Sequence, residues 1–178
     1  MLGDSLSSGY GIRPDQGWVS LLGQRLIDKS FRYQLINSSI SGNTTIDGLN
    51  RIQGLLKQYQ PEIVVIELGG NDGLRGLSLK AMQQNLSAMI KLSEKAGARV
   101  VLTGIKIPPN YGKRYTDAFY NVYLQLVEQY SLTFIPFLLD RVGGNGTLMQ
   151  QDGLHPTAEA QTIILENAWP HLLEVLKK

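Results

Sequence analysis

Ser5, Asp152 and His155 are the residues of this 178-residue sequence whose types and spacing could perform nucleophilic chemistry. Asp152 precedes His155 by three residues, so its carboxylate could hold one ring nitrogen while the other nitrogen points away. An imidazole held in this way can act as the general base for a serine hydroxyl. Each residue also has an ordinary interpretation, because Ser5 and Asp152 suit turns and His155 suits the start of a helix.

Two further segments contain groups that could stabilise the oxyanion formed when a serine attacks an acyl carbon. These groups are the backbone N–H of Gly42 and the side-chain amide of Asn71. Both belong to Gly- and Asn-containing segments that are also common in turns. The prediction of acyl-transfer chemistry therefore depends on the conjunction of these groups with Ser5, Asp152 and His155.

The composition is typical of one globular domain, which we expect to span residues 1–178. With 43% hydrophobic and 18% charged residues, the chain can bury a sizeable core. The net charge of +2 includes no concentrated basic block, so we expect no nucleic-acid partner. No apolar run reaches the roughly 18 residues that span a bilayer, so we expect no stable membrane insertion. The lack of cysteine excludes thiolate catalysis, disulfides and cysteine-based zinc sites.

Three common sequence motifs are not met. The G-x-S-x-G elbow around Ser5 fails because Ser7 occupies the position of its last glycine. Neither G-x-G-x-x-G nor G-x-x-x-x-G-K-[ST] occurs, which weakens a dinucleotide or nucleoside triphosphate interpretation.

Hydrophobic periodicity predicts helices at residues 17–29, 45–59, 79–96, 115–130 and 157–177, the last opening with Pro156. Apolar runs between them predict strands at residues 33–37, 62–68, 98–104 and 132–137, and Leu2 is expected to end a fifth strand. This alternation predicts an α/β fold, a three-layer α/β/α sandwich around a five-stranded parallel sheet. Because the first strand is only a stub, we expect the natural protein to have residues upstream of Met1.

Loops that follow the strands should contain the chemistry, because open parallel sheets bind ligands at the carboxyl ends of their strands. Four of these segments, in the right order, resemble the sequence blocks of the GDSL or SGNH hydrolases. They are Gly3-Asp4-Ser5-Leu6, Gly42, Gly69-Gly70-Asn71-Asp72 and Asp152-Gly153-Leu154-His155. The resemblance spans the chain and narrows to a bacterial group of multifunctional thioesterases, proteases, lysophospholipases and similar arylesterases. It implies a flavodoxin-like sandwich, no metal or organic cofactor, and a periplasmic or secreted location.

The resemblance also implies a role for each block. Ser5, Asp152 and His155 would form the catalytic triad, and the Ser5 N–H, the Gly42 N–H and the Asn71 amide would form the oxyanion hole. The implied function is a serine esterase that hydrolyses carboxylic esters and acyl thioesters through an acyl-enzyme on Ser5. A carbohydrate acetyl-esterase and a non-catalytic binding module on the same scaffold are the alternatives, with a flavodoxin-like nucleotide binder as a third.

One residue departs from the pattern of the family. Asn43 stands where Asp is expected after the glycine, which removes a charge near the oxyanion site. We therefore expect the hydrogen bonds of this loop to differ.

The loops around residues 73–79 and 105–115 are the candidate binding site for an acyl chain. Its candidate lining residues are Gly73, Leu74, Ile107, Pro108 and Tyr111. Burial of an acyl chain there would be worth about 0.8 kcal/mol for each methylene. The same residues could instead only pack the loops onto the sheet. In the resembled group the first loop moves with acyl chain length, which makes Gly73 and Gly76 candidate hinges. We expect a monomer whose partners are small-molecule esters or thioesters.

Overall fold

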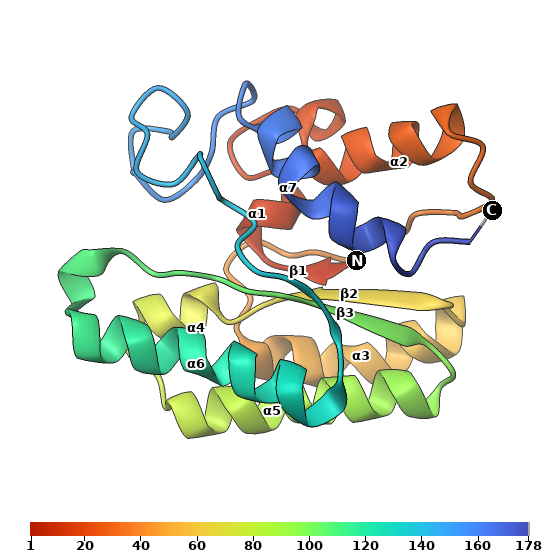
Figure 1. Ribbon diagram of the computed structural model, residues 1–178, viewed down its shortest axis with the longest axis horizontal. Coiled ribbons are helices and arrows are strands. Elements are labelled where there is room, and N and C mark those ends of the chain that lie inside the picture. Colours follow the sequence, from red (N-terminus) through yellow and green to blue (C-terminus); the bar gives the residue numbers. More distant parts are fainter. Residues whose placement is uncertain (178) are drawn as a thin grey trace.

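A parallel four-stranded sheet lies at the centre of the molecule, in a computed structural model that describes residues 1–177 (Figure 1). Its strands are β1 (Leu2–Gly3), β2 (Ile63–Glu67), β3 (Arg99–Thr103) and β4 (Thr133–Ile135), placed side by side in chain order. Every neighbouring pair is parallel, so all the strands end at the same edge of the sheet. That edge is where an α/β protein places its functional loops.

One of the five predicted strands, that at residues 33–37, is wrong, since the structure has irregular chain there. This segment nevertheless runs beside β1. The Met1 amine donates a hydrogen bond to the Ile36 carbonyl at 2.8 Å, and the Ser38 N–H donates to the Met1 carbonyl at 2.9 Å. Because β1 contains only two residues, most of residues 33–37 has no strand beside it with which to form a ladder.

Helices cover both faces of the sheet, which confirms the predicted three-layer α/β/α sandwich (Figure 1). One face is covered by α2 (Trp18–Asp28) and α7 (Gln161–Leu173), and the other by α3 (Thr45–Tyr59), α5 (Leu79–Lys95) and α6 (Lys113–Tyr130). Side chains of β2 alternate between the two cores: Val64 and Ile66 belong to one and Val65 to the other. A strand buried on both faces explains the continuous apolar run that predicted it.

The last helix is shorter than predicted and begins at Gln161 rather than at Pro156. Residues before it form an antiparallel bridge between Met149 and Pro156. The Thr157 N–H then donates to the Leu148 carbonyl at 2.8 Å, so these residues pair with a preceding segment instead of starting a helix. The other predicted helices agree with α2, α3, α5 and α6 apart from small shifts at their ends.

Four short helical segments lie in stretches for which the sequence predicted no helix. They are α1 (Ser5–Ser8), α4 (Gly70–Leu74) and the 3-10 turns Pro14–Gln16 and Pro109–Tyr111. α1 follows β1 after Asp4, and α4 follows β2 after Leu68 and Gly69, so both begin at the carboxyl edge of the sheet. Among residues 1–177, no helix has the length and apolar character that crossing a bilayer requires.

Candidate active site

Ser5 is the first residue of α1, and only Asp4 separates it from β1. Asp4 caps this helix, because its Oδ1 accepts a hydrogen bond from the Leu6 N–H at 3.0 Å. Gly9 ends the helix with a φ of +76°, a conformation that favours glycine. The sequence Asp4 to Gly9 therefore folds into one helical turn that holds the Ser5 hydroxyl at the edge of the sheet.

His155 and Asp152 reach this hydroxyl from the turn that precedes α7. His155 Nε2 lies 2.8 Å from Ser5 Oγ, and His155 Nδ1 lies 2.6 Å from Asp152 Oδ2. The other carboxylate oxygen of Asp152 accepts hydrogen bonds from the N–H groups of Leu154 at 2.9 Å and His155 at 3.0 Å. Asp152 thus both shapes the turn and orients the imidazole, so the turn-forming role and the imidazole-holding role do not exclude each other.

The electrostatics of Asp152 suit this arrangement. Desolvation raises the pKa of the carboxyl group, but hydrogen bonds from His155 and from the Leu154 N–H outweigh this effect and lower the pKa to about 2. Asp152 is therefore ionised across the neutral pH range. A carboxylate in contact with Nδ1 holds the proton there and leaves Nε2 free to accept the proton of Ser5.

Asn71 lies in α4 and joins the two loops that flank it in space. Its Nδ2 donates to Asp4 Oδ2 at 3.2 Å and to the Asn43 carbonyl at 3.0 Å. Gly42, next to Asn43, has a φ of +81°, which explains the glycine at this position. The structure thus brings the loops of Ser5, Gly42 and Asn71 to one place, as expected for an oxyanion site.

Asn43, which departs from the family pattern, helps to build this loop. Its side-chain oxygen accepts a hydrogen bond from Arg51 Nε at 3.0 Å. A second arginine, Arg75, donates to the Gly42 carbonyl at 3.1 Å. The neutral side chain of Asn43 is therefore used as a hydrogen-bond acceptor for a cation, and the loop is held from both sides.

The candidate substrate-binding residues divide into buried and exposed groups. Gly73 is packed so closely that a Cβ atom would lie 2.5 Å from Phe119 Cε2, and Ile107 is only 7% exposed. Leu74 and Pro108 are half-buried, and Tyr111 is exposed with its hydroxyl donating to the Leu74 carbonyl at 2.9 Å. Packing accounts for the burial of Gly73 and Ile107. Binding of an acyl chain by the surface around Leu74, Pro108 and Tyr111 stays a prediction.

Three residues that the sequence analysis did not assign to the site lie against it. Tyr10 places its ring 4.5 Å from the His155 ring, centroid to centroid, and no sequence signal indicated this contact. Asp4 caps α1, but the sequence predicted no helix at residues 5–8 and so did not indicate this role. Glu67 lies under the nucleophile and ends an apolar strand, where a carboxyl group is unusual enough to signal a special role.

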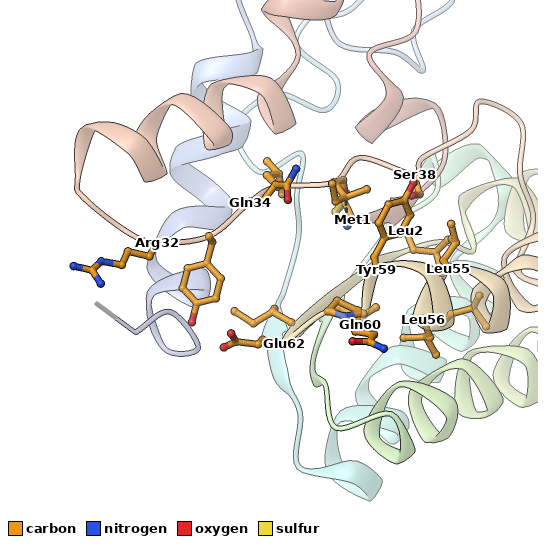
Figure 2. A pocket seen from close by; sticks show the side chains of 17 residues that line it. Met1, Leu2, Arg32, Gln34, Ser38, Leu55, Leu56, Tyr59, Gln60 and Glu62 are labelled. Carbon is orange, nitrogen blue, oxygen red and sulfur yellow. Dashed lines mark hydrogen bonds between the residues drawn. The ribbon is translucent and has the colours of Figure 1, made fainter.

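A cavity of about 270 Å³ lies at the opposite ends of the strands (Figure 2). It is lined by Met1 and Leu2, by the segment around Gln34, and by residues near the start of β2 such as Glu62. Since Ser5 follows the carboxyl end of β1, this cavity is separate from the Ser5 site. Within residues 1–177, no group of three or more His, Asp or Glu side chains is arranged to hold a metal ion.

A Ser–His–Asp arrangement at the carboxyl edge of a parallel sheet is that of a serine hydrolase. Comparison with known proteins gives the family. The chain belongs to the GDSL-like Lipase/Acylhydrolase family, whose model matches residues 1–163. The chain is therefore a hydrolase that acts on ester bonds, and the resemblance found in the four sequence blocks is confirmed.

Several relatives are similar over nearly the whole chain. Esterase TesA of Pseudomonas aeruginosa is 48% identical over 176 residues, which cover 99% of this chain and 88% of the relative. The thioesterase 1/protease 1/lysophospholipase L1 of Escherichia coli is 40% identical over 166 residues, covering 93% of this chain and 78% of the relative. The crystal structure of TesA superimposes with a TM-score of 0.97 at 48% identity, covering 98% and 97% of the two chains.

A second solved structure is that of the psychrotrophic esterase EstA from a Pseudoalteromonas species, inhibited by monoethylphosphonate. It superimposes with a TM-score of 0.93 at 42% identity and covers 97% of this chain and 94% of its own. These similarities confirm the fold that the sequence predicted, apart from the number of strands.

Proposed function

We propose that this chain is a serine esterase of the thioesterase and lysophospholipase type, which hydrolyses carboxylic esters and acyl thioesters through an acyl-enzyme on Ser5. The observation that carries the proposal is the continuous chain of contacts from Ser5 Oγ through His155 to Asp152, at 2.8 and 2.6 Å. The relatives named as esterase, arylesterase and thioesterase support it.

The reaction begins when Ser5 Oγ attacks the acyl carbon and His155 Nε2 accepts its proton. The imidazolium that forms is stabilised by the ionised Asp152, and it then gives the proton to the leaving alcohol or thiol. Water attacks the acyl-enzyme in the second half of the reaction, again with His155 as the base. The oxygen of the carbonyl group carries the negative charge in both steps.

The donors for this charge are the N–H groups of Ser5 and Gly42 and the side-chain amide of Asn71. Both N–H bonds of the Asn71 amide already have acceptors, Asp4 Oδ2 and the Asn43 carbonyl. The oxyanion therefore takes over or shares one of these two hydrogen bonds when it forms. Such donors tighten on the reacting substrate rather than in the free enzyme.

The acyl chain is expected to lie along Leu74, Pro108 and Tyr111, with Gly73 and Ile107 as the packed layer beneath them. This surface belongs to α4 and to the 3-10 turn Pro109–Tyr111, which the Tyr111 hydroxyl joins by its hydrogen bond to Leu74. Burial of about 0.8 kcal/mol for each methylene favours medium or long acyl chains over acetate.

Hydrolysis of p-nitrophenyl esters from acetate to palmitate tests the proposal, with Ser5→Ala as the control. The expected result is activity that rises toward medium or long chains in the unchanged protein and falls to background in Ser5→Ala. A steep preference for acetate would favour a carbohydrate acetyl-esterase instead. Equal activity in both proteins would contradict a reaction at Ser5.

We also propose a periplasmic or secreted monomer, in line with the family resemblance. Cell fractionation and light scattering on a sizing column test these two points. Recovery of the protein only in the cytosol, or a mass well above 19.7 kDa, would contradict them.

A further inference from the structure

Glu67 is a fully buried carboxyl group beneath the nucleophile, and the mechanism above does not use it. It ends β2 and is paired in register with Gly3. Its Oε2 accepts hydrogen bonds from the Ser7 hydroxyl at 2.7 Å and from the Asp4 N–H at 3.3 Å. These donors stand on either side of Ser5 in the chain, so a single carboxyl oxygen fixes both flanks of the nucleophile.

The space around Glu67 suits an uncharged group. A Cβ atom on Gly3 would lie 2.7 Å from Glu67 Oε2 and 3.0 Å from the Ser39 hydroxyl, so glycine makes room for this carboxyl group. Glu67 Oε1 is buried without a hydrogen-bond partner among residues 1–177. A negative charge would be poorly compensated there, whereas a protonated carboxyl group leaves only a hydroxyl to satisfy.

Asp4 is the second carboxyl group at this place, and its contacts favour the ionised form. It is only 3% exposed, and it accepts hydrogen bonds from the Leu6 N–H at 3.0 Å and from the Asn71 amide at 3.2 Å. Two buried carboxyl groups held this close cannot both ionise cheaply. Each oxygen of Asp4 accepts one hydrogen bond, whereas both donors to Glu67 meet Oε2 and leave Oε1 without a partner among the described residues. Asp4 therefore keeps the charge, and the proton stays on Glu67.

The directions of the pKa shifts agree with this assignment. Burial, and then the charge of Asp4, raise the pKa of Glu67 well above its usual value. Burial also raises the pKa of Asp4, to about 6, while its hydrogen bonds from Leu6 and Asn71 and the charge of His155 act against the increase. Both directions are those expected for a pair that contains a single charge, which the hydrogen bonds place on Asp4.

Two other titratable groups face this pair from the helices packed against it. Tyr123 of α6 donates its hydroxyl proton to the Leu68 carbonyl, and burial raises its pKa well above the usual value. Asp72 of α4 is held by the backbone N–H and the hydroxyl of Thr45 at 2.9 and 2.6 Å. Neither of them forms a hydrogen bond with Glu67 within the described residues, so neither compensates a charge on it.

We propose that Glu67 is a positioning residue of the oxyanion hole and that it works only as a neutral carboxyl group. It holds the Ser5 segment through Asp4 and Ser7, and Asp4 in turn holds the amide of Asn71. Ionisation of Glu67 at alkaline pH places a second negative charge beside Asp4 and beneath the developing oxyanion, and so lowers kcat. This inference rests on the esterase function proposed above.

The test compares the pH dependence of kcat for the unchanged protein, Glu67→Gln and Glu67→Leu from pH 6 to pH 10, with p-nitrophenyl butyrate. Ser5→Ala supplies the background rate, and circular dichroism at each pH checks folding. Glutamine keeps an acceptor for Ser7 and Asp4 and is neutral at every pH. Leucine removes the acceptor, so its kcat at pH 7 is expected to fall about tenfold or more below that of Glu67→Gln with little change in KM.

The unchanged protein is expected to lose activity at the alkaline end, approaching about tenfold for each pH unit above the pKa of Glu67. In Glu67→Gln this alkaline decline is expected to disappear. Normalised profiles that superimpose for the two proteins would overturn the proposal while leaving the esterase function intact. Hydrolysis by the unchanged protein no faster than by Ser5→Ala would instead overturn the proposed function itself.

Ser7→Ala is a second variant that tests the same point if Glu67→Gln does not fold. The Ser7 hydroxyl stabilises the ionised form of Glu67, so its loss is expected to move the alkaline decline to higher pH. An unchanged or lowered position of the decline would contradict the proposal. Tyr123→Phe, which removes the neighbouring hydroxyl, is expected to leave the alkaline decline in place, and its loss in this variant would assign the decline to Tyr123 instead.

Discussion

Replacement of Asp152 by Asn separates the two tasks of this residue. Asn keeps one oxygen, which can still accept the Leu154 and His155 N–H bonds that shape the turn. Its amide nitrogen then faces His155 Nδ1, where the carboxylate oxygen stood at 2.6 Å. Because this nitrogen can only donate, Nδ1 must become the acceptor and the ring proton moves to Nε2. The imidazole can then no longer accept the proton of Ser5.

The size of this effect follows from the exposure of Asp152. A buried triad carboxylate is worth about 10,000-fold in kcat when Asn replaces it. The Asp152 side chain is 40% exposed, so water screens part of its charge, whereas the tautomer effect is not screened. We therefore expect kcat to fall about 1,000-fold, or about 4 kcal/mol in activation free energy, with the fold unchanged.

The assay is hydrolysis of p-nitrophenyl butyrate with urea unfolding as the check on stability. Asp140→Asn is the matched control, because Asp140 is an exposed turn residue whose carboxylate makes a long contact with Arg141 at 3.9 Å, and its hydrogen bonds to Asn167 and Phe137 involve only the backbone. It is expected to leave kcat within about twofold, since the residue touches no part of the site. A loss smaller than about tenfold in Asp152→Asn would refute the role of Asp152.

Three further variants test the site and the packing beneath it. Asn71→Ala removes an oxyanion donor and is expected to lower kcat about 100- to 1,000-fold, measured as ester hydrolysis; near-normal kcat would remove Asn71 from the site. Asp4→Asn tests the buried charge: the pKa of Asp4 is about 6 in the folded protein against 3.8 for an unperturbed aspartate, so its protonation stabilises the fold at low pH and this contribution is lost as pH rises through about 6. Relative to the unchanged protein, the variant should gain about 2.4 kcal/mol in unfolding free energy between pH 4 and pH 8, and equal shifts of the urea curves of both proteins between these pH values would contradict this. Gly73→Ala places a Cβ atom 2.5 Å from Phe119 and should cost about 1–3 kcal/mol in urea unfolding, whereas Gly54→Ala, with open space in α3, should not destabilise.

Much of the fold could be predicted because strong periodic patterns occupy most of the chain. The apolar run at residues 62–68 is continuous because β2 is buried on both faces, and the long helices show one apolar stripe each. The prediction of a strand at residues 33–37 was wrong for a physical reason. Its residues are apolar enough for a strand, but a strand also needs a partner, and β1 provides only two residues.

The catalytic constellation could be placed from sequence because parallel strands end at one edge. Ser5, Asn71 and His155 follow different strands, so the topology alone brings their loops together. What the sequence could not give was the contacts of neighbouring side chains, such as the Tyr10 ring against His155 or Glu67 beneath Ser5. Those contacts depend on loop conformation and on registers between strands, which leave no local pattern in the residues.

Covalent labelling of Ser5 tests the central claim most directly. An ethyl phosphonate with a p-nitrophenolate leaving group should react with Ser5 Oγ, form the Oγ–phosphorus bond and release one p-nitrophenolate. Intact mass and peptide mapping should find one adduct per chain, on Ser5, with concurrent loss of esterase activity. No adduct should form on Ser5→Ala, and Asp152→Asn should react far more slowly. An adduct on another residue, or full activity in protein labelled at Ser5, would contradict a nucleophilic role for this serine.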